Sequence, residues 1–447
     1  MQMNQCTASV KQLQLPLLGD EPLIGFHEED APVTTHSLME RVLERENMFR
    51  ALQKVIRNKG SAGIDGMTVD DLPAFLTQHW PLVSEQLLNG NYRPTAVKQV
   101  LIPKPDGGER KLGIPTVLDR LIQQALLQIL QLEWDKMFSH FSFGFRPGRS
   151  AHKAVTWSRR YVNEGYHWVV DMDLEKFFDR VNHDKLMHRV KCRVEDKRVL
   201  KLINRYLNAG ALVGDQWAAT EEGTPQGGPL SPLLANLLLD DLDKELEKRK
   251  LRFVRYADDC NIYVKSERAG ERVLKSISHW LTMKLKLTVN KGKSAVDRPW
   301  KRQFLGFTFT ARGKIKRLKV SEKSLARFKY KILSITKRTR GRTVKHIVAD
   351  LREYLLGWRA YFGITQVKTP LKLFDKWVRR KLRCYIWKQW GRSGYRQLRK
   401  RGVDRQLAWN TSKSAHGPWR LSHSPAVYYA LPNSYFRMLG VPELVEV

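Results

Sequence analysis

The pattern of hydrophobic and polar residues predicts long amphipathic helices separated by short strands. In several segments apolar residues recur every three to four positions, which places them on one face of a helix. These segments are residues 37–52, 117–137, 150–163, 233–246, 321–337, 343–362 and 371–390. The first four lie among strand-like segments, whereas the last three follow one another, so the pattern predicts a mixed region followed by a helical one.

Four segments are rich in strand-forming residues. Residues 98–112 predict two strands joined by the turn Pro-Asp-Gly-Gly at 105–108, a combination typical of a β-hairpin. Trp168, Val169 and Val170 begin a strand, and residues 304–309 alternate as a strand around Gly306. Residues 251–264 place strand formers on both sides of Tyr-Ala-Asp-Asp. We expect the last segment to form a hairpin that bends at Asp258 and Asp259.

Carboxylates interrupt two of these apolar strands. Asp258 and Asp259 are adjacent, and alternation places Asp171 and Asp173 on one face of the strand that begins at Trp168. Paired carboxylates in apolar surroundings repel one another, and burial raises their pKa values. Mg²⁺ removes this cost, because it binds one or two carboxylates together with substrate phosphates. Asp-Asp alone also suits an exposed turn, but a second acidic strand favours a two-metal site for nucleotidyl transfer.

The charge of the chain indicates a polyanionic partner. The 447 residues carry a formal net charge of +34, which favours nucleic acid over a membrane surface. The final 137 residues contain 33 Lys and Arg but only 7 Asp and Glu, so this segment supplies +26 of that charge. A basic helical bundle with aromatic residues suits folded RNA, where phosphate contacts give affinity and rings stack on unpaired bases.

Other compositional features exclude several classes of protein. The four cysteines are scattered, without the paired spacing of a zinc site, and indicate a reducing compartment. No apolar run approaches the length needed to span a membrane, and the N-terminus lacks the hydrophobic core of a signal peptide. We therefore expect a bacterial cytoplasmic protein.

A series of motifs resembles the group II intron reverse transcriptases, also called intron-encoded maturases. YADD at 256–259 resembles the polymerase motif of that family, and DLEKFFD at 173–179 resembles its first metal-binding motif. The other motifs, in the family's order, are SAGIDG at 61–66, IPKPDGGERKLGIPT at 102–116, FGFRPGRSAHKAV at 143–155, GTPQGGPLSPLLANLLLDDLD at 223–243, LKLTVNKGKS at 285–294 and FLGF at 304–307. The helices LREYLLGWRAYF and LFDKWVRRKLRCYIWKQW resemble the maturase domain, and the resemblance covers about residues 40–440.

The resemblance implies an α+β right-hand polymerase with fingers, palm and thumb, followed by a basic helical maturase domain. We expect fingers and palm at residues 36–310, and the helical thumb and maturase region, domain X, at 311–395. Residues 396–447 would form a basic tail that binds RNA or DNA. Residues 1–35 lack periodicity and predict a flexible leader.

The resemblance also assigns the chemistry. Asp173, Asp258 and Asp259 would be the catalytic carboxylates and would hold two Mg²⁺ ions. Lys104 and Arg110 flank the predicted fingertip turn and would contact the triphosphate, although both are also compatible with solvated loop charges.

Four further residues would contact the nucleotide or its base pair. Phe178 would lie under the sugar, where a ring leaves no room for a 2′-hydroxyl, although ordinary core packing is the alternative. Gln226 and Gly227 would touch the template or the base pair, and Lys293 would lie near the triphosphate.

On the predicted helix 371–390, four cations are candidate contacts to RNA phosphates. They are Arg379, Arg380, Lys381 and Arg383.

The expected function is RNA-directed DNA synthesis from dNTPs, coupled to the splicing and mobility of the chain's own group II intron RNA. The partners would be that RNA, a DNA target and a primer. Two alternatives are a splicing-only RNA-binding maturase and a domesticated bacterial reverse transcriptase in phage defence or DNA repair. The sequence up to Val447 has no Cys/His cluster, so it resembles the family members that lack a zinc-bearing endonuclease.

Overall fold

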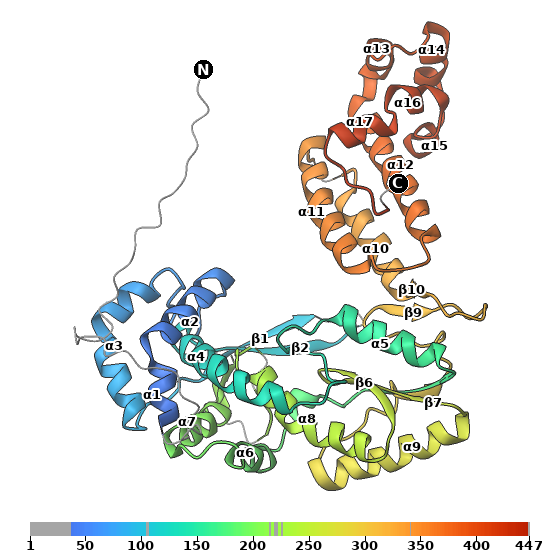
Figure 1. Cartoon of the computed structure of the whole chain (residues 1–447). Helices are drawn as coiled ribbons and strands as arrows, with labels where there is room; N and C mark the ends of the chain where they lie inside the picture. Colours follow the sequence, from blue (N-terminus) through green and yellow to red (C-terminus); the bar gives the residue numbers. More distant parts are fainter. Residues whose placement is uncertain are drawn as a thin grey trace, which may run out of the picture. The chain divides into compact units, whose positions relative to one another are not determined.

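The chain folds into two compact units in the computed structural model (Figure 1). The first unit comprises the described residues up to Ser150 together with Val170–Val296, and the second comprises Ala151–Val169 and the residues from Asp297 onward. The structure describes residues 37–103, 107–213, 216–218, 222–224, 227–339 and 341–445. The predicted leader, residues 1–35, lies outside the described residues. The compact units do not follow the predicted boundary at residue 310.

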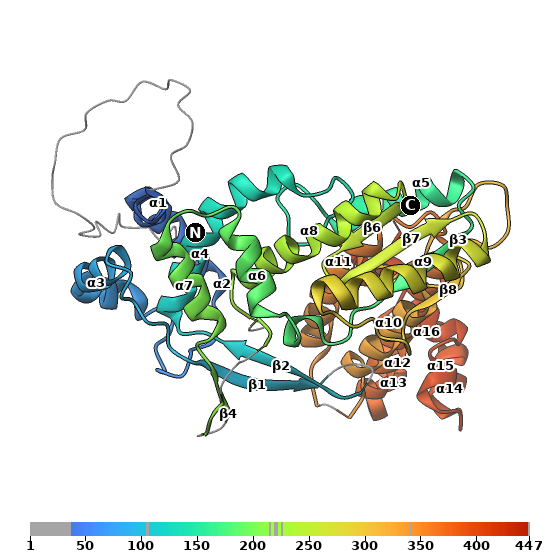
Figure 2. The ribbon, with the colours of Figure 1, turned by 90° about the horizontal axis from the view of Figure 1, so that it is seen from below.

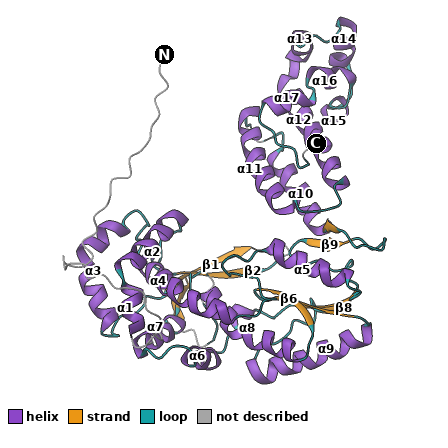
Figure 3. Cartoon of the chain, in the orientation of Figure 1, coloured by secondary structure: helices purple, strands orange, loops and turns teal. Residues whose placement is uncertain are grey.

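Helices make up most of the first unit, with strands at its centre (Figure 3). The helices are α1 (Leu38–Leu43), α2 (Arg45–Asn58), α3 (Leu72–Leu88), α4 (Val117–Trp134), α6 (His183–Lys191), α7 (Lys197–Leu207), α8 (Ser231–Lys248) and α9 (Glu267–Trp280). The helices predicted at residues 117–137 and 233–246 are therefore confirmed. The single helix predicted at residues 37–52 is instead two helices, because Glu44 has an extended ψ of 134° that ends α1. Local chemistry sets the start of α4, because the Thr116 hydroxyl accepts a hydrogen bond from the backbone N–H of Asp119.

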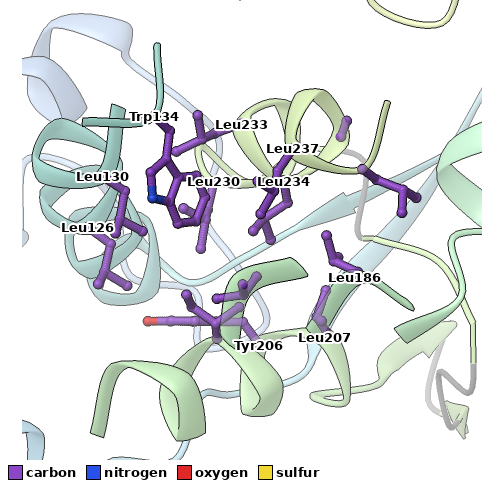
Figure 4. Close-up of a cluster of buried hydrophobic side chains, with 14 of the residues drawn as sticks. Leu126, Leu130, Trp134, Leu186, Tyr206, Leu207, Leu230, Leu233, Leu234 and Leu237 are labelled. Atoms are coloured by element: carbon purple, nitrogen blue, oxygen red, sulfur yellow. The ribbon is translucent and has the colours of Figure 1, made fainter. Parts of the chain in front are cut away.

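The core of the first unit joins helices from distant parts of the sequence (Figure 4). The indole of Trp134 on α4 is 1% exposed and lies beside leucines of α8. The labelled side chains are Leu126, Leu130 and Trp134 of α4, Leu186 of α6, Tyr206 and Leu207 of α7, and Leu230, Leu233, Leu234 and Leu237 at the start of α8. Burying each leucine contributes about 1.5–3 kcal/mol, so this cluster fixes α8 against α4, α6 and α7.

One sheet carries the predicted fingertip hairpin. Its strands are β1 (Val97–Pro103), β2 (Glu109–Ile114), β4 (Ala211–Val213) and β5 (Gln216–Ala218), in the order β2-β1-β4-β5. β1 and β2 are antiparallel with Pro103 opposite Glu109, which confirms the predicted hairpin (Figure 2). Gly107 and Gly108 in its turn have φ values of +89° and +78°, a region that glycine enters without steric cost.

A second sheet carries the two acidic segments. Its strands are β3 (Trp168–Met172), β6 (Arg252–Tyr256), β7 (Asp259–Val264) and β8 (Ala295–Asp297), in the order β6-β7-β3-β8. β6 and β7 form the predicted hairpin, with Tyr256 paired to Asp259. The turn therefore consists of Ala257 and Asp258, one residue earlier than predicted, and Asp259 begins β7.

The second unit is mainly helical. It contains α5 (Ala151–Asn163), the hairpin strands β9 (Phe307–Phe309) and β10 (Leu318–Val320), and the helices α10 (Glu322–Ile335), α11 (Val344–Phe362), α12 (Thr369–Trp390), α13 (Gly394–Lys400), α14 (Arg405–Lys413), α15 (Pro418–Leu421), α16 (Pro425–Ala430) and α17 (Asn433–Met438). The predicted helices at 150–163, 321–337, 343–362 and 371–390 are confirmed. Phe328, Leu351, Leu382 and Phe436 belong to its separate hydrophobic core. Among the described residues, no helix has the length and apolar composition required to cross a membrane.

Candidate active site

The β6–β7 turn and the end of β3 bring Asp173, Asp258 and Asp259 into mutual electrostatic range. Asp173 follows the last residue of β3, and the adjacent strand β7 begins at Asp259. The charges of Asp173 and Asp258 both act on the carboxyl of Asp259 and raise its pKa. The three carboxylates predicted to cooperate therefore share one end of the sheet, although 85 residues separate Asp173 from Asp258 in the sequence.

The loop that precedes β8 holds the backbone of Asp173. The Ser294 hydroxyl accepts a hydrogen bond from the Asp173 N–H at 3.0 Å, and the Asn290 N–H donates to the Asp173 carbonyl at 2.8 Å. Lys293, from the same loop, places its Nζ 3.6 Å from Asp173 Oδ2. This loop is the LKLTVNKGKS motif, so Lys293 lies beside the carboxylates, as its predicted role requires.

Burial and mutual repulsion raise the pKa values of the paired carboxylates. Burial raises the pKa of Asp258, the charge of Asp173 raises it further, and Arg110 opposes the shift. The Asp259 residue is exposed, but protein atoms crowd around its carboxylate. Desolvation by these atoms, together with the charges of Asp258, Asp173 and Asp171, raises the pKa of Asp259 to about 7.

The carboxylates suit a hard divalent cation that the substrate helps to bind. Among the residues that the structure describes, no three His, Cys, Asp or Glu side chains are grouped closely enough to hold a metal ion unaided. Mg²⁺ needs no such cage, because it binds one or two carboxylates and completes its shell with water and substrate phosphates. Oxygen donors whose raised pKa values reflect uncompensated negative charge fit this ion. The number of ions remains a prediction.

Two of the predicted nucleotide-binding positions are cations beside the carboxylates, and two further positions lie outside the described residues. Arg110 is exposed on β2, opposite Ile102, and is near enough to Asp258 to lower its pKa. Lys104 and Gln226 fall on residues that the structure does not describe.

The Phe178 segment and the Gly-rich loop lie together. The ring of Phe178 is partly buried and lies 5.1 Å from that of Phe177, centroid to centroid. The backbone carbonyl of Phe178 accepts a hydrogen bond from the Thr224 N–H at 2.7 Å. Gly227 has φ +135°, and a Cβ there would lie 2.5 Å from the carbonyl oxygen of Gly113 on β2. Only glycine fits at residue 227, because any side chain would displace β2.

Sequence reasoning missed a buried polar network beneath the Asp258 turn. Arg255 is fully buried, with Nε 2.7 Å from Asp243 Oδ1 and Nη2 2.5 Å from Asp243 Oδ2. Its Nη1 donates to the Asn236 amide oxygen at 3.0 Å and to the Ala257 carbonyl at 2.9 Å. An arginine between Val254 and Tyr256 in an apolar strand was the available signal, because a buried guanidinium needs partners.

Two of the four cations predicted to bind RNA are buried in the second unit, which contradicts that prediction for them. Arg379 is 5% exposed, and its Nη2 lies 2.8 Å from Glu443 Oε1. Arg383 is 4% exposed, and it donates to the Leu431 carbonyl at 2.8 Å and to the Asn433 side chain at 2.9 Å. Both arginines therefore fasten α12 to the C-terminal residues, and burial removes them from direct RNA contact.

The other two cations of α12 lie over aromatic rings. The Arg380 guanidinium lies 4.0 Å from the centroid of the Trp419 ring, and Lys381 Nζ lies 4.4 Å from the same ring. Lys381 also lies 5.6 Å from the ring of Trp377. Both side chains are only partly buried, so Arg380 and Lys381 stay compatible with the predicted RNA contact.

The solvent face of α10 carries cations that the sequence analysis did not single out. Arg327 and Lys331 are exposed and lie one turn apart on the helix. Tyr330, between them, is 76% exposed. An exposed ring flanked by cations provides the stacking surface and phosphate contacts that RNA recognition uses.

Comparison with known proteins finds two family matches along the chain. Residues 102–309 match the family described as "Reverse transcriptase (RNA-dependent DNA polymerase)", and residues 325–403 match "Group II intron, maturase-specific domain". Protein YkfC of Escherichia coli is 30% identical in an alignment 307 positions long that covers 60% of this chain and 81% of YkfC.

Two further proteins are similar over smaller shares. The group II intron-encoded protein LtrA of Lactococcus lactis subsp. cremoris is 36% identical over 215 residues, which are 48% of this chain and 36% of LtrA. The chain thus spans about a third of that relative. A structure of apo telomerase from Candida Tropicalis, truncated from the C-terminal domain, has 16% identity and a TM-score of 0.40 over 55% of this chain and 60% of its own.

The two domain matches follow one another in the order that the sequence motifs predict, and the chain covers most of YkfC. The chain belongs to the group II intron reverse transcriptase/maturase family.

Proposed function

We propose that this protein is an RNA-directed DNA polymerase that binds its own group II intron RNA and assists intron splicing and mobility by target-primed reverse transcription. One observation carries the proposal: Asp173, Asp258 and Asp259 converge beside Arg110 and Lys293 in a chain that also contains a maturase domain. Its substrates are dNTPs, a DNA primer and an RNA template. Because YkfC and LtrA come from bacteria, we propose that it acts in the bacterial cytoplasm.

In this proposal the chain's own residues bind and orient the substrates. Asp173, Asp258 and Asp259 would hold two Mg²⁺ ions. Bound Mg²⁺ supplies activation of the primer 3′-hydroxyl and charge neutralisation of the leaving pyrophosphate. Arg110 and Lys293 bind the triphosphate, since both cations already lie beside these carboxylates.

Phe178 excludes ribonucleotides in the same proposal. Its ring offers no hydrogen bond to a 2′-hydroxyl and occupies the space that this hydroxyl would need. The hydrogen bond from Thr224 to the backbone of Phe178 keeps this residue beside the Gly-rich loop.

The second unit supplies most of the affinity for intron RNA. Its charge favours binding to the phosphate backbone. Exposed residues of α10 give that charge a defined surface, with Arg327 and Lys331 for phosphates and Tyr330 for an unpaired base.

Primer extension tests the polymerase part. The purified protein should extend a DNA primer annealed to an RNA template when dNTPs and Mg²⁺ are supplied. Asp258→Ala should reduce the rate more than about a hundredfold, because a metal ligand stabilises the transition state by several kcal/mol. Filter binding should show that the same variant retains intron RNA. No extension by the wild-type protein, or a variant as active as wild type, would reject the assignment.

Splicing tests the maturase part. Sequencing of RNA that copurifies with the protein should recover a group II intron, and the protein should accelerate splicing of that intron at low Mg²⁺. If only bulk cellular RNA is recovered and no intron is enriched, the maturase part of the proposal is rejected, and the polymerase part stands by itself.

A further inference from the structure

Ala257 has a backbone conformation that its own side chain does not favour. Its φ of +56° lies in the left-handed region, which costs a residue with a Cβ about 1–2 kcal/mol. Asp258 follows it directly, so the conformation of Ala257 sets where the first carboxylate points. Strain of this kind persists only where the surrounding structure imposes it.

Two contacts restrain this residue. Arg255 Nη1 donates to the Ala257 carbonyl at 2.9 Å. The backbone of Gly144 lies close to the Ala257 nitrogen, since a Cβ at Gly144 would be 2.3 Å from it. The segment before Gly144 pairs with the outer edge of β6, where the Phe143 N–H donates to the Arg255 carbonyl and the Arg255 N–H donates to Phe141, both at 2.9 Å.

Asn236 joins the two contacts. Its amide nitrogen donates to the Gly144 carbonyl at 2.8 Å, and its amide oxygen accepts from Arg255 Nη1 at 3.0 Å. Asp243 lies about two turns after Asn236 on α8, and it accepts two hydrogen bonds from the Arg255 guanidinium. Asn236 is 1% exposed and Asp243 is fully buried. Both belong to α8, whose first leucines pack in the core of the first unit (Figure 4), so this helix holds the turn in place.

We infer that Asn236, Arg255 and Asp243 are positioning residues that set the affinity of Asp258 and Asp259 for the divalent cation. The inference rests on the proposed polymerase function and deepens it. Residues that orient metal-binding side chains change metal affinity about 10- to 100-fold when they are removed. They touch neither substrate nor metal, so their effect reaches the site through the Ala257 turn.

The direct test is Mn²⁺ binding, measured by electron paramagnetic resonance. The protein is first bound to an RNA template, a dideoxy-terminated DNA primer and the next dNTP, so that the site is complete but no bond forms. The Mn²⁺ signal of the active site is defined as the part that Asp258→Ala removes. Asn236→Ala should weaken that Mn²⁺ affinity about 10- to 100-fold.

Asn47 provides a control of the same chemistry. It is an asparagine of the first unit with 0% exposure, and both its amide nitrogen and its amide oxygen form hydrogen bonds. Its amide nitrogen donates to Val42 and Ala125, and its oxygen accepts from Gln128. Asn47→Ala should lower the melting temperature about as much as Asn236→Ala, and leave Mn²⁺ affinity unchanged.

Each result has a defined meaning. Equal Mn²⁺ affinities in Asn236→Ala and wild type, or equal losses in both asparagine variants, overturn the inference. If Asn236→Ala does not fold, Asn236→Asp answers the question, because it keeps the acceptor for Arg255 but loses the donor to Gly144. Unchanged Mn²⁺ affinity in that variant also overturns the inference. If the wild-type protein binds Mn²⁺ at this site but does not extend a primer, the proposed function is rejected and the positioning role remains.

Discussion

Asp258 and Asp119 both have carboxyl groups whose pKa values burial raises, but their surroundings give them different uses. Asp119 accepts hydrogen bonds from the side chains of Thr116, Tyr92 and Tyr206. Asp258 instead faces the like charge of Asp173. A buried carboxyl with hydroxyl donors is satisfied within the fold, whereas one beside another carboxylate is stabilised by a cation.

Asp119 should make stability depend on pH in a predictable direction. Burial raises the pKa of Asp119, so the folded carboxyl keeps its proton to a higher pH than the unfolded one. The free energy of unfolding should therefore fall as pH rises above the unfolded pKa of about 3.9, by up to about 1.4 kcal/mol per pH unit. Asp119→Asn should lack this contribution. Urea unfolding of both proteins between pH 5 and 8 measures the difference.

Asp71 provides a control, because its pKa is shifted in the opposite direction to that of Asp119. Hydrogen bonds from the hydroxyl and backbone N–H of Thr68 lower the pKa of Asp71. Its contribution to stability is present above the unfolded pKa and is lost as pH falls. Parallel pH profiles for wild type and Asp119→Asn would show that Asp119 has the same pKa in both states.

Phe178 should decide which sugar the polymerase accepts. Phe178→Ala opens the space beside the sugar, so discrimination against ribonucleotides should drop at least about tenfold. The ratio of kcat/KM values for a dNTP and the matching rNTP measures it. Phe177→Ala is the neighbouring control: its ring is 2% exposed, so it should lower stability by about 3–5 kcal/mol. If Phe177→Ala changes sugar discrimination and Phe178→Ala does not, the two roles are reversed.

At the scale of the element, α12 shows how an amphipathic basic helix divides its charges. Its sequence contains cations on several faces, and the arginines that point inward bind acidic or carbonyl groups of the C-terminal residues. Arg380 and Lys381 lie over Trp419. Periodicity predicted the helix correctly but could not say which cations the later residues would cover.

Arg379 should contribute to stability rather than to RNA affinity. Its partner Glu443 also pairs with Arg437, whose side chain is 63% exposed. Arg379→Ala removes the buried partner of a carboxylate whose side chain is 20% exposed, and should cost about 1.5–3 kcal/mol of unfolding free energy. Arg437→Ala removes an exposed pair to the same carboxylate and should cost about 0–1 kcal/mol. Urea unfolding compares the two variants. A larger loss in Arg437→Ala would mean that Arg437, rather than Arg379, is the main partner of Glu443.

At the scale of the whole molecule, the proposed function assigns chemistry and most of the nucleic-acid affinity to different units. The first unit contains the three site carboxylates, and the final 137 residues carry +26 of the net charge. The two units have separate hydrophobic cores, so a surface change in one need not disturb the packing of the other.

Neutralising the α10 surface should therefore weaken RNA binding without stopping synthesis. The double variant Arg327→Gln, Lys331→Gln should bind intron RNA more weakly, with a log–log salt slope shallower by roughly 1.4 to 1.8 if both contact phosphates. Extension of a short pre-annealed primer at low salt should persist.

The control is Arg272→Gln, Lys275→Gln on α9 of the first unit, where both side chains are also exposed. This control should leave the salt slope for intron RNA unchanged. If the two double variants bind alike, net charge rather than the α10 surface determines affinity.

Much of the fold is determined by local sequence. Helix periodicity in residues 117–137 and 343–362, and the turn chemistry of Pro-Asp-Gly-Gly, predict elements that the structure contains. Such patterns are readable because side-chain spacing and backbone preferences act within one turn of chain. The apolar strands around Asp258 and Asp259 likewise predict from sequence alone that these carboxylates form a metal site.

The tertiary structure alone decided which distant residues meet. Asp173 reaches Asp259 because β3 and β7 are neighbours in the sheet, and Lys293 reaches Asp173 through the loop before β8. The Arg255 network and the burial of Arg379 also depend on partners far along the chain. A charged residue has the same local pattern whether it is solvated or paired, because its free energy depends on what packs around it in the folded state.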